Sequence, residues 1–154
     1  MLLGKMYKKE LTTPVLFLIF NRPDTTEKVF KQIKIAKPKK LYVVADGPRK
    51  NNAEDEKNCI LTRKLINNID WDCDLKKLYR DENLGCKNSV SSAITWFFEN
   101  EEMGIILEDD CYPDESFFEF CQILLKRYES ENQVMMIAGT NYLDKDILNF
   151  ILKR

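Results

Sequence analysis

The fold of the chain is constrained most by a pattern that recurs along it: a short apolar segment, then polar or turn-forming residues, then apolar residues at helical spacing. Residues 14–20 and 41–45 are continuous apolar runs with several β-branched side chains. Such runs are typical of strands that are buried on both faces of a parallel sheet. Residues 75–79 and 104–107 repeat the pattern, and residues 134–138 predict a fifth strand.

Helices are expected between these strands, because apolar residues recur there at intervals of three and four. Asp24 and Glu27 have the spacing of a capping box, which places the start of the first helix beside them. Further helices are expected over residues 53–69 and 88–99, and after Pro113. Four aromatic residues of the last two helices are expected to pack in the core: Phe97, Phe98, Phe117 and Phe120.

Strands that alternate with helices predict an α/β fold, a three-layer sandwich with a mostly parallel sheet. The chain has 154 residues, of which 44% are hydrophobic, and no low-complexity linker divides it. We therefore expect a single domain over residues 1–154. Residues 144–154 predict a final helix that has no evident packing partner in the sequence.

The composition of the chain excludes several kinds of chemistry. The 24 basic and 25 acidic residues nearly cancel, so no nucleic-acid or membrane partner is expected, and the basic bias of the first 50 residues is typical of solvated surfaces. The absence of histidine excludes Ser-His and Cys-His pairs and histidine-ligated zinc. Five cysteines without a C-x-x-C motif predict reduced thiols and a cytoplasmic location. No targeting or transmembrane segment is expected, because the strongest apolar run is too short to span a bilayer.

In an open parallel sheet, ligands bind beyond the carboxyl ends of the strands, where loop amides and helix N-termini meet. Each of the first four predicted strands ends in polar side chains. These residues are Asn21 and Arg22, Asp46, Arg80 and Asp81, and Glu108, Asp109 and Asp110. We expect them to lie along one edge of the sheet, which we call the carboxyl rim.

Glu108, Asp109 and Asp110 form an acidic triplet at the end of the clearest predicted strand. Carboxylate oxygens at such a position suit Mg²⁺ or Mn²⁺, which keep several waters and share their ligand shell with substrate phosphates. An acidic triplet also solvates a strand end or caps the next helix, and that interpretation stays open. Three adjacent like charges repel one another, so their position at a buried strand end favours a bound cation.

The other polar residues of the carboxyl rim allow two interpretations each. Asp46 precedes Gly47, which suits a plain turn and equally suits hydrogen bonds from a base or ribose. Arg22 and Arg80 either offer bidentate guanidinium groups to phosphates or merely neutralise the acidic triplet. Gly85 either permits a close backbone approach or forms an ordinary turn.

Four motifs, in their order along the chain, carry a resemblance to a known family. They are PVLFLIFNRP, YVVADGPR, NLG and GIILEDDCYP. Over roughly residues 14–140, this order resembles the GT-A glycosyltransferases. The resemblance is to the group that includes the animal N-acetylglucosaminyltransferase that starts complex N-glycans, together with related bacterial sugar transferases. In that group, a triplet like Glu108-Asp109-Asp110 plays the part of the DxD motif.

The resemblance implies a sugar transfer from a nucleotide-diphosphate sugar, with uridine diphosphate (UDP) as the nucleotide, to a saccharide or another hydroxyl acceptor. It implies Mn²⁺ or Mg²⁺ held by Asp110, with Asp109 facing the ribose or sugar and Glu108 supporting the donor. The implied nucleotide contacts are Asn21, Arg22, Asp46 and Arg80. Members of this group invert the anomeric centre with a carboxylate base, and the sequence assigns that base to no residue.

Enzymes of this group normally continue beyond the fifth strand, so the resemblance predicts a truncated or split enzyme that lacks the acceptor-binding part. The alternative is a non-catalytic sugar-nucleotide-binding or regulatory module. A nucleotidylyltransferase would have a G-x-G-x-R loop where this chain has Asn21, Arg22 and Pro23. A P-loop enzyme would need G-x-x-x-x-G-K-[ST], which the sequence lacks.

Overall fold

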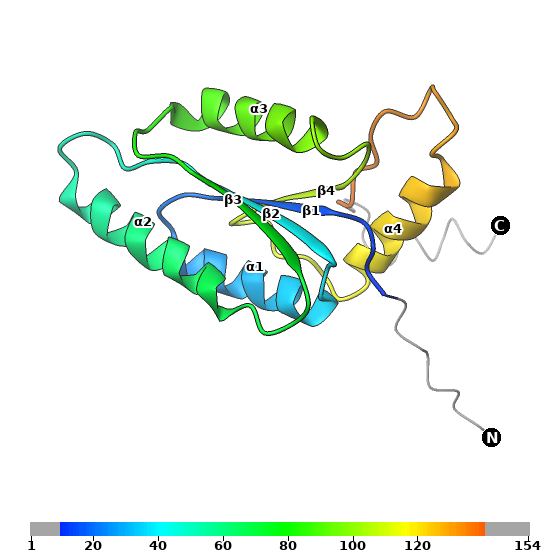
Figure 1. Cartoon of the computed structure of the whole chain (residues 1–154), viewed down its shortest axis with the longest axis horizontal. Helices are drawn as coiled ribbons and strands as arrows, with labels where there is room; N and C mark the ends of the chain where they lie inside the picture. Colours follow the sequence, from blue (N-terminus) through cyan, green and yellow to red (C-terminus); the bar gives the residue numbers. More distant parts are fainter. Residues whose placement is uncertain (1–9, 141–154) are drawn as a thin grey trace, which may run out of the picture.

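The computed structural model describes residues 10–140, in which four strands and four α-helices alternate (Figure 1). A short 3₁₀ helix extends the second α-helix. In chain order the elements are β1 (Val15–Ile19), α1 (Pro23–Ala36), β2 (Lys40–Ala45), α2 (Ala53–Leu65), η1 (Ile66–Asn68), β3 (Asp74–Tyr79), α3 (Gly85–Phe98), β4 (Ile105–Glu108) and α4 (Phe117–Arg127). Within the described residues, no helix is long and apolar enough to cross a membrane.

The four strands form one parallel sheet in the order β3-β2-β1-β4. Helix α3 covers one face of the sheet, and α1 and α2 cover the other, with α4 beside them (Figure 1). The predicted α/β class, its parallel sheet and its three layers are therefore confirmed. The order also places β4 next to β1, although β1, β2 and β3 run consecutively toward the opposite edge.

The core is built from side chains that alternate between the two faces of the central strands. Val15, Phe17 and Ile19 of β1 pack toward α1 and α4, whereas Leu16 and Leu18 pack toward α3. All five are buried. Burial of each such side chain contributes about 1.5–3 kcal/mol, which explains why these apolar runs could be recognised as strands.

Helix α1 starts one residue before the predicted capping box. Pro23 occupies the first helical position, which suits its fixed φ angle and its missing N–H group. Arg22 is the N-cap residue and makes no capping hydrogen bond with its side chain. Asp24 therefore lies inside the first turn, where its charge favours the helix dipole, and the capping box is wrong.

The predicted fifth strand is also wrong. Residues 134–138 have no regular secondary structure, and Met135 and Met136 are 96% and 83% exposed. An apolar run has strand propensity, but a strand exists only when a neighbouring backbone supplies its hydrogen bonds. In the structure, this segment forms no ladder with β4. The helix predicted over residues 144–154 lies outside the described residues.

The buried face of α4 differs from the predicted one. Phe118, Cys121 and Gln122 are buried, whereas Phe120 is 45% exposed and Phe117 is half-buried. The polar Gln122 fits inside because its Oε1 accepts hydrogen bonds from the backbone N–H groups of Thr12 and Thr13, at 2.8 and 3.0 Å. These bonds connect α4 to the chain just before β1.

The helices around residues 53–69 and 88–99 form with shifted ends. The first is divided into α2 and η1, and the second starts earlier, at Gly85. Phe97 is fully buried, as predicted, and packs edge-on against Tyr42. Phe98 is 46% exposed, because neighbouring helical positions point about 100° apart and cannot both face the sheet.

Candidate functional site

The carboxyl rim contains the point at which the strand order reverses. The loop after β1 leads through α1 to β2, whereas β4 lies on the other side of β1. In open α/β sheets, ligands bind in the crevice outside the carboxyl ends of the strands at such a reversal. The residues directly after β1 and β4 therefore form the candidate site.

Arg22 and two members of the acidic triplet meet at this position. Arg22 Nη2 donates a hydrogen bond to Asp109 Oδ1 at 2.6 Å, and Nη1 donates to Asp110 Oδ2 at 2.8 Å. One guanidinium thus contacts two consecutive carboxylates that are 87 and 88 residues away along the chain. The pairing depends on the parallel register that places Leu18 beside Glu108 at the ends of β1 and β4.

The two aspartates have different surroundings. The side chain of Asp109 is 3% exposed, and its Oδ2 accepts a hydrogen bond from the backbone N–H of Phe20 at 3.2 Å. Burial raises the pKa of the Asp109 carboxyl, although the charge of Arg22 and the Phe20 N–H act against this increase. The side chain of Asp110 is 45% exposed. Asp109 is therefore a buried anchor for Arg22, and Asp110 is the accessible carboxylate.

Glu108 is the third member of the acidic triplet and lies on the other face of the sheet. Along β4, Ile105 and Leu107 are buried in the cluster with α1 and α4, whereas Ile106 and Glu108 are exposed. Helix α3 packs over side chains of β1 and β2 on that face. Glu108 is consequently separated from the Arg22 contacts of the two aspartates.

A divalent cation fits this site only if substrate phosphates and waters complete its coordination. In the part of the chain that the structure describes, no group of three or more carboxylate, thiol or imidazole side chains could hold a metal ion. Of the two carboxylates that Arg22 contacts, Asp110 is the accessible one. Mg²⁺ and Mn²⁺ commonly bind proteins through one or two carboxylates plus waters and substrate phosphates, so this donor set fits such an ion when a phosphate is present.

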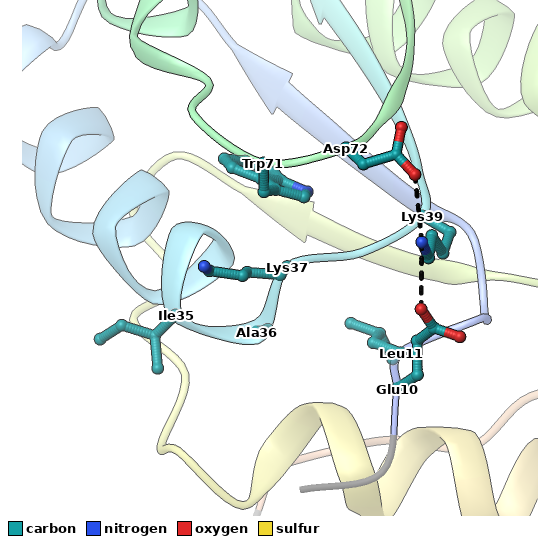
Figure 2. A pocket seen from close by; sticks show the side chains of 8 residues that line it. All are labelled: Glu10, Leu11, Ile35, Ala36, Lys37, Lys39, Trp71 and Asp72. Carbon is teal, nitrogen blue, oxygen red and sulfur yellow. Dashed lines mark hydrogen bonds and ion pairs between the residues drawn. The ribbon is translucent and has the colours of Figure 1, made fainter.

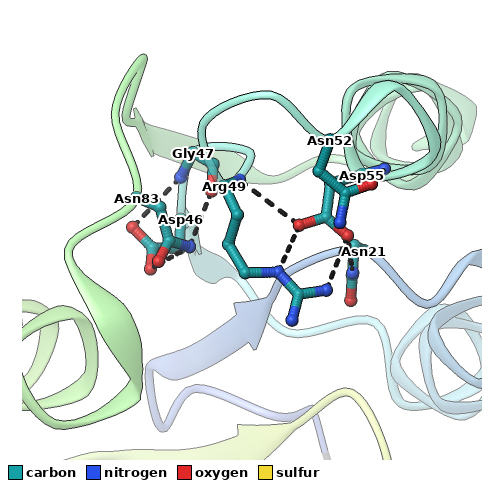
Figure 3. A network of polar contacts seen from close by, with 7 residues as sticks. All are labelled: Asn21, Asp46, Gly47, Arg49, Asn52, Asp55 and Asn83. Carbon is teal, nitrogen blue, oxygen red and sulfur yellow. Dashed lines mark hydrogen bonds and ion pairs between the residues drawn. The ribbon is translucent and has the colours of Figure 1, made fainter.

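Asp46 lies at the same rim, where it connects two loops (Figure 3). Its Oδ1 accepts hydrogen bonds from the backbone N–H groups of Gly47 and Leu84, both at 3.0 Å, and its Oδ2 accepts one from Asn83 Nδ2 at 3.1 Å. Leu84 is the N-cap residue of α3. Asp46 is buried, and these bonds hold the loop after β2 against the start of α3.

Asn21 contacts Asp55, a residue that the sequence analysis did not predict to belong to the site. Its Nδ2 donates a hydrogen bond to Asp55 Oδ1 at 2.7 Å, and the guanidinium of Arg49 binds both oxygens of Asp55 (Figure 3). Asn52 caps α2 by accepting from the backbone N–H of Asp55 at 3.0 Å. The Asn52-to-Asp55 spacing at the start of a helix was the signal in the sequence that could have located this group.

Arg80 is not brought to the acidic triplet. Its guanidinium donates hydrogen bonds to the hydroxyls of Ser89 and Ser92 on α3, at 3.4 and 2.8 Å. Its carbonyl oxygen accepts a bond from Arg63, which also binds the carbonyl of Asp46. The predicted nucleotide-binding residues thus fall into three groups: Arg22 with Asp109 and Asp110, Asn21 with Asp55, and Asp46 with Arg80 beside the start of α3.

The contacts of Asp55 predict that the stability of the fold depends on pH. The hydrogen bonds from Arg49, followed by the one from Asn21, hold the pKa of Asp55 well below its usual range. A lowered folded-state pKa stabilises the fold above the unfolded-state value, about 3.9, and this contribution is lost as the pH falls toward the folded-state value. We expect Asp55→Asn to lower the melting temperature by roughly 3–5 °C at pH 7 and by less at pH 3, where the carboxyl group is already mostly protonated in the unfolded chain.

Thermal unfolding followed by circular dichroism at both pH values would check this. Asp72→Asn is the matched control, because Asp72 pairs with Lys39 but its side chain is 94% exposed. An equal loss for Asp55→Asn at pH 7 and pH 3 would contradict the assigned role of the carboxylate.

A hollow of about 300 Å³ lies at the opposite end of the sheet (Figure 2). It is bordered by the end of α1 and by the segments that lead into β2 and β3, including Lys39, Trp71 and Asp72. Trp71 Nε1 donates a hydrogen bond to the carbonyl of Pro38 at 2.9 Å. None of the predicted site residues lines this hollow, so it is separate from the carboxyl rim.

The candidate site rests on the contacts observed within this chain. Comparison with protein-family models, with curated proteins and with solved structures found no match. The motif resemblance to GT-A glycosyltransferases accordingly stays a prediction. The structure shows the parallel α/β fold and the hydrogen bonds of Arg22 to Asp109 and Asp110 at the reversal point.

Proposed function

We propose that the carboxyl rim is the donor-binding site of a metal-dependent glycosyltransferase of the GT-A type, which transfers a sugar from a UDP-linked donor to a hydroxyl acceptor. The observation that supports this most is the contact of Arg22 with Asp109 and Asp110 at the strand-order reversal. It brings a phosphate-binding guanidinium and an accessible carboxylate to the place where α/β sheets bind nucleotides.

The two kinds of charge suit a nucleoside diphosphate with its cation. The guanidinium of Arg22 is half-exposed and presents a planar fork that can bind phosphate oxygens in a bidentate manner. Asp110 would hold Mn²⁺ or Mg²⁺, while Asp109 would hold the Arg22 side chain directly and the end of β1 through the backbone N–H of Phe20. When bound, the cation would neutralise the charge that develops on the departing diphosphate.

The rim residues that lie away from the acidic triplet would form the nucleoside side of the site. Asp46 fixes the loop after β2 against the N-terminus of α3, and Asn21 joins the end of β1 to Asp55 at the start of α2. These contacts join the loops after β1, β2 and β3 to neighbouring elements without a ligand, which would reduce the entropy cost of binding.

Calorimetric titration with UDP, in the presence and absence of Mn²⁺, tests this proposal. We expect UDP to bind in a metal-dependent manner and ADP, the control, to bind more weakly. Absence of UDP binding under both conditions would overturn the proposal. Hydrolysis of UDP-sugars, measured on the same preparation, then separates an enzyme from a non-catalytic binding module, because a module would bind without turnover.

A further inference from the structure

Arg22 already occupies the position where the proposed function needs a metal. Its Nη1 lies 2.8 Å from Asp110 Oδ2, and the other oxygen of Asp110 lies 3.7 Å from the Cys111 thiol. A divalent ion at Asp110 would therefore stand close to a guanidinium, and the two like charges would repel one another. In the state that the structure describes, Arg22 is the counter-ion of both aspartates.

The contacts of Arg22 with the two aspartates differ in how easily they can be exchanged. The contact with Asp109 involves a carboxylate that is 3% exposed, and breaking it would leave a buried charge without its partner. The contact with Asp110 joins two half-exposed groups, which is the kind of pair that contributes little to stability. Arg22 can therefore release Asp110 at small cost while it stays bound to Asp109.

A diphosphate would replace the hydrogen-bond acceptor that Arg22 Nη1 loses when it leaves Asp110. Phosphate oxygens accept charge-assisted hydrogen bonds from arginine at least as readily as a carboxylate does. If Nη1 turns from Asp110 to a phosphate, Asp110 becomes free for a cation that the same phosphates also bind. The diphosphate and the cation would then each favour the binding of the other, and linkage makes this effect reciprocal.

We propose that Arg22 is an internal cation that competes with the divalent metal for Asp110 and is transferred to the donor diphosphate, so that metal and diphosphate bind cooperatively. This inference rests on the proposed function, since it concerns the order of events at that donor site. It adds that Arg22 opposes binding of the metal alone and promotes binding of the metal together with the diphosphate.

Binding of Mn²⁺ to the full chain, measured by electron paramagnetic resonance of the free ion with and without UDP, tests the proposal. In the unmodified chain, we expect UDP to raise the affinity for Mn²⁺. Without UDP, Arg22→Gln is expected to bind Mn²⁺ about fivefold more tightly than the unmodified chain, because the competing charge is removed. In this variant, UDP is expected to raise the Mn²⁺ affinity by a smaller factor than in the unmodified chain, because the phosphates still bind the ion but no competing guanidinium is released.

Two further variants make the measurement specific. Arg22→Lys keeps the charge but has no fork to span both carboxylates, so an intermediate gain is expected, and it replaces Arg22→Gln if that variant does not fold. Arg49→Gln removes another rim guanidinium, which is bound to Asp55 and not to the acidic triplet, and its Mn²⁺ affinity should stay unchanged.

The outcomes separate the two proposals. An unchanged or weaker Mn²⁺ affinity in both Arg22 variants, or an equal gain in Arg49→Gln, overturns the competition, while metal-dependent UDP binding by the unmodified chain would still support the donor site. If neither the unmodified chain nor any variant binds Mn²⁺ or UDP, both proposals are overturned.

Discussion

Gly47→Ala is expected to lower the free energy of unfolding by about 3 kcal/mol, because the added methyl group meets backbone that cannot move away easily. A Cβ at position 47 would lie 2.4 Å from the carbonyl carbon of Glu82 and 2.7 Å from that of Asp81. Relief of this contact requires the loop after β2 to separate from the loop after β3. Urea unfolding, with the midpoint and slope both determined, measures the loss.

The same variant also tests whether the packed loops prepare the site. Separation of the loops would break the hydrogen bonds from Leu84 and Asn83 to Asp46, so UDP binding should weaken along with stability. Gly85→Ala is the matched control. Gly85 has a φ of +76° but open space where its Cβ would lie, so only the conformational cost of about 1 kcal/mol is expected. Equal losses for the two variants would show that the close loop contact contributes nothing.

Asp110→Asn is expected to weaken binding of UDP in the presence of Mn²⁺ at least tenfold, which corresponds to about 1.4 kcal/mol. The substitution keeps the volume of the side chain and removes its negative charge. Because Asp110 is half-exposed and its pairing with Arg22 contributes little, the melting temperature should change by only about 1–2 °C. Calorimetry with and without Mn²⁺ checks the first expectation, and thermal unfolding checks the second.

Glu115→Gln removes the same charge from an exposed position in the loop that follows Asp110, and it serves as the control for a general electrostatic effect. This variant should bind UDP and Mn²⁺ as the unmodified chain does. If Asp110→Asn retained full metal-dependent affinity with a normal melting temperature, Asp110 would not be the metal ligand.

The local elements of the fold could be predicted from the sequence. The apolar runs at residues 14–20 and 41–45 correspond to β1 and β2, because a strand buried on both faces must be apolar at consecutive positions. The helix containing Phe97 also appears where its spacing indicated. The fifth strand did not follow from the apolar run at residues 134–138, since a strand depends on a paired neighbour as well as on its own residues.

The sequence also indicated which residues would lie at the carboxyl rim, because each of them lies at or just after the end of a strand. It did not indicate how those residues pair. Asp46 is occupied by the start of α3, and Arg80 turns toward serines of α3. The sequence does not distinguish Asp55, which binds Asn21 and Arg49, because an acidic residue in the first turn of a helix is common and its partners lie outside that helix.

The approximate positions of the first four strands, of the helices between them and of the polar strand ends were thus determined by the sequence alone, through local periodicity and burial. Only the tertiary structure decided that Arg22 meets Asp109 and Asp110, because this contact requires β4 to lie beside β1. Local patterns extend over one or two turns of a helix or a few residues of a strand. A contact between side chains almost 90 residues apart depends instead on strand order and register, which are set by the packing of the whole sheet.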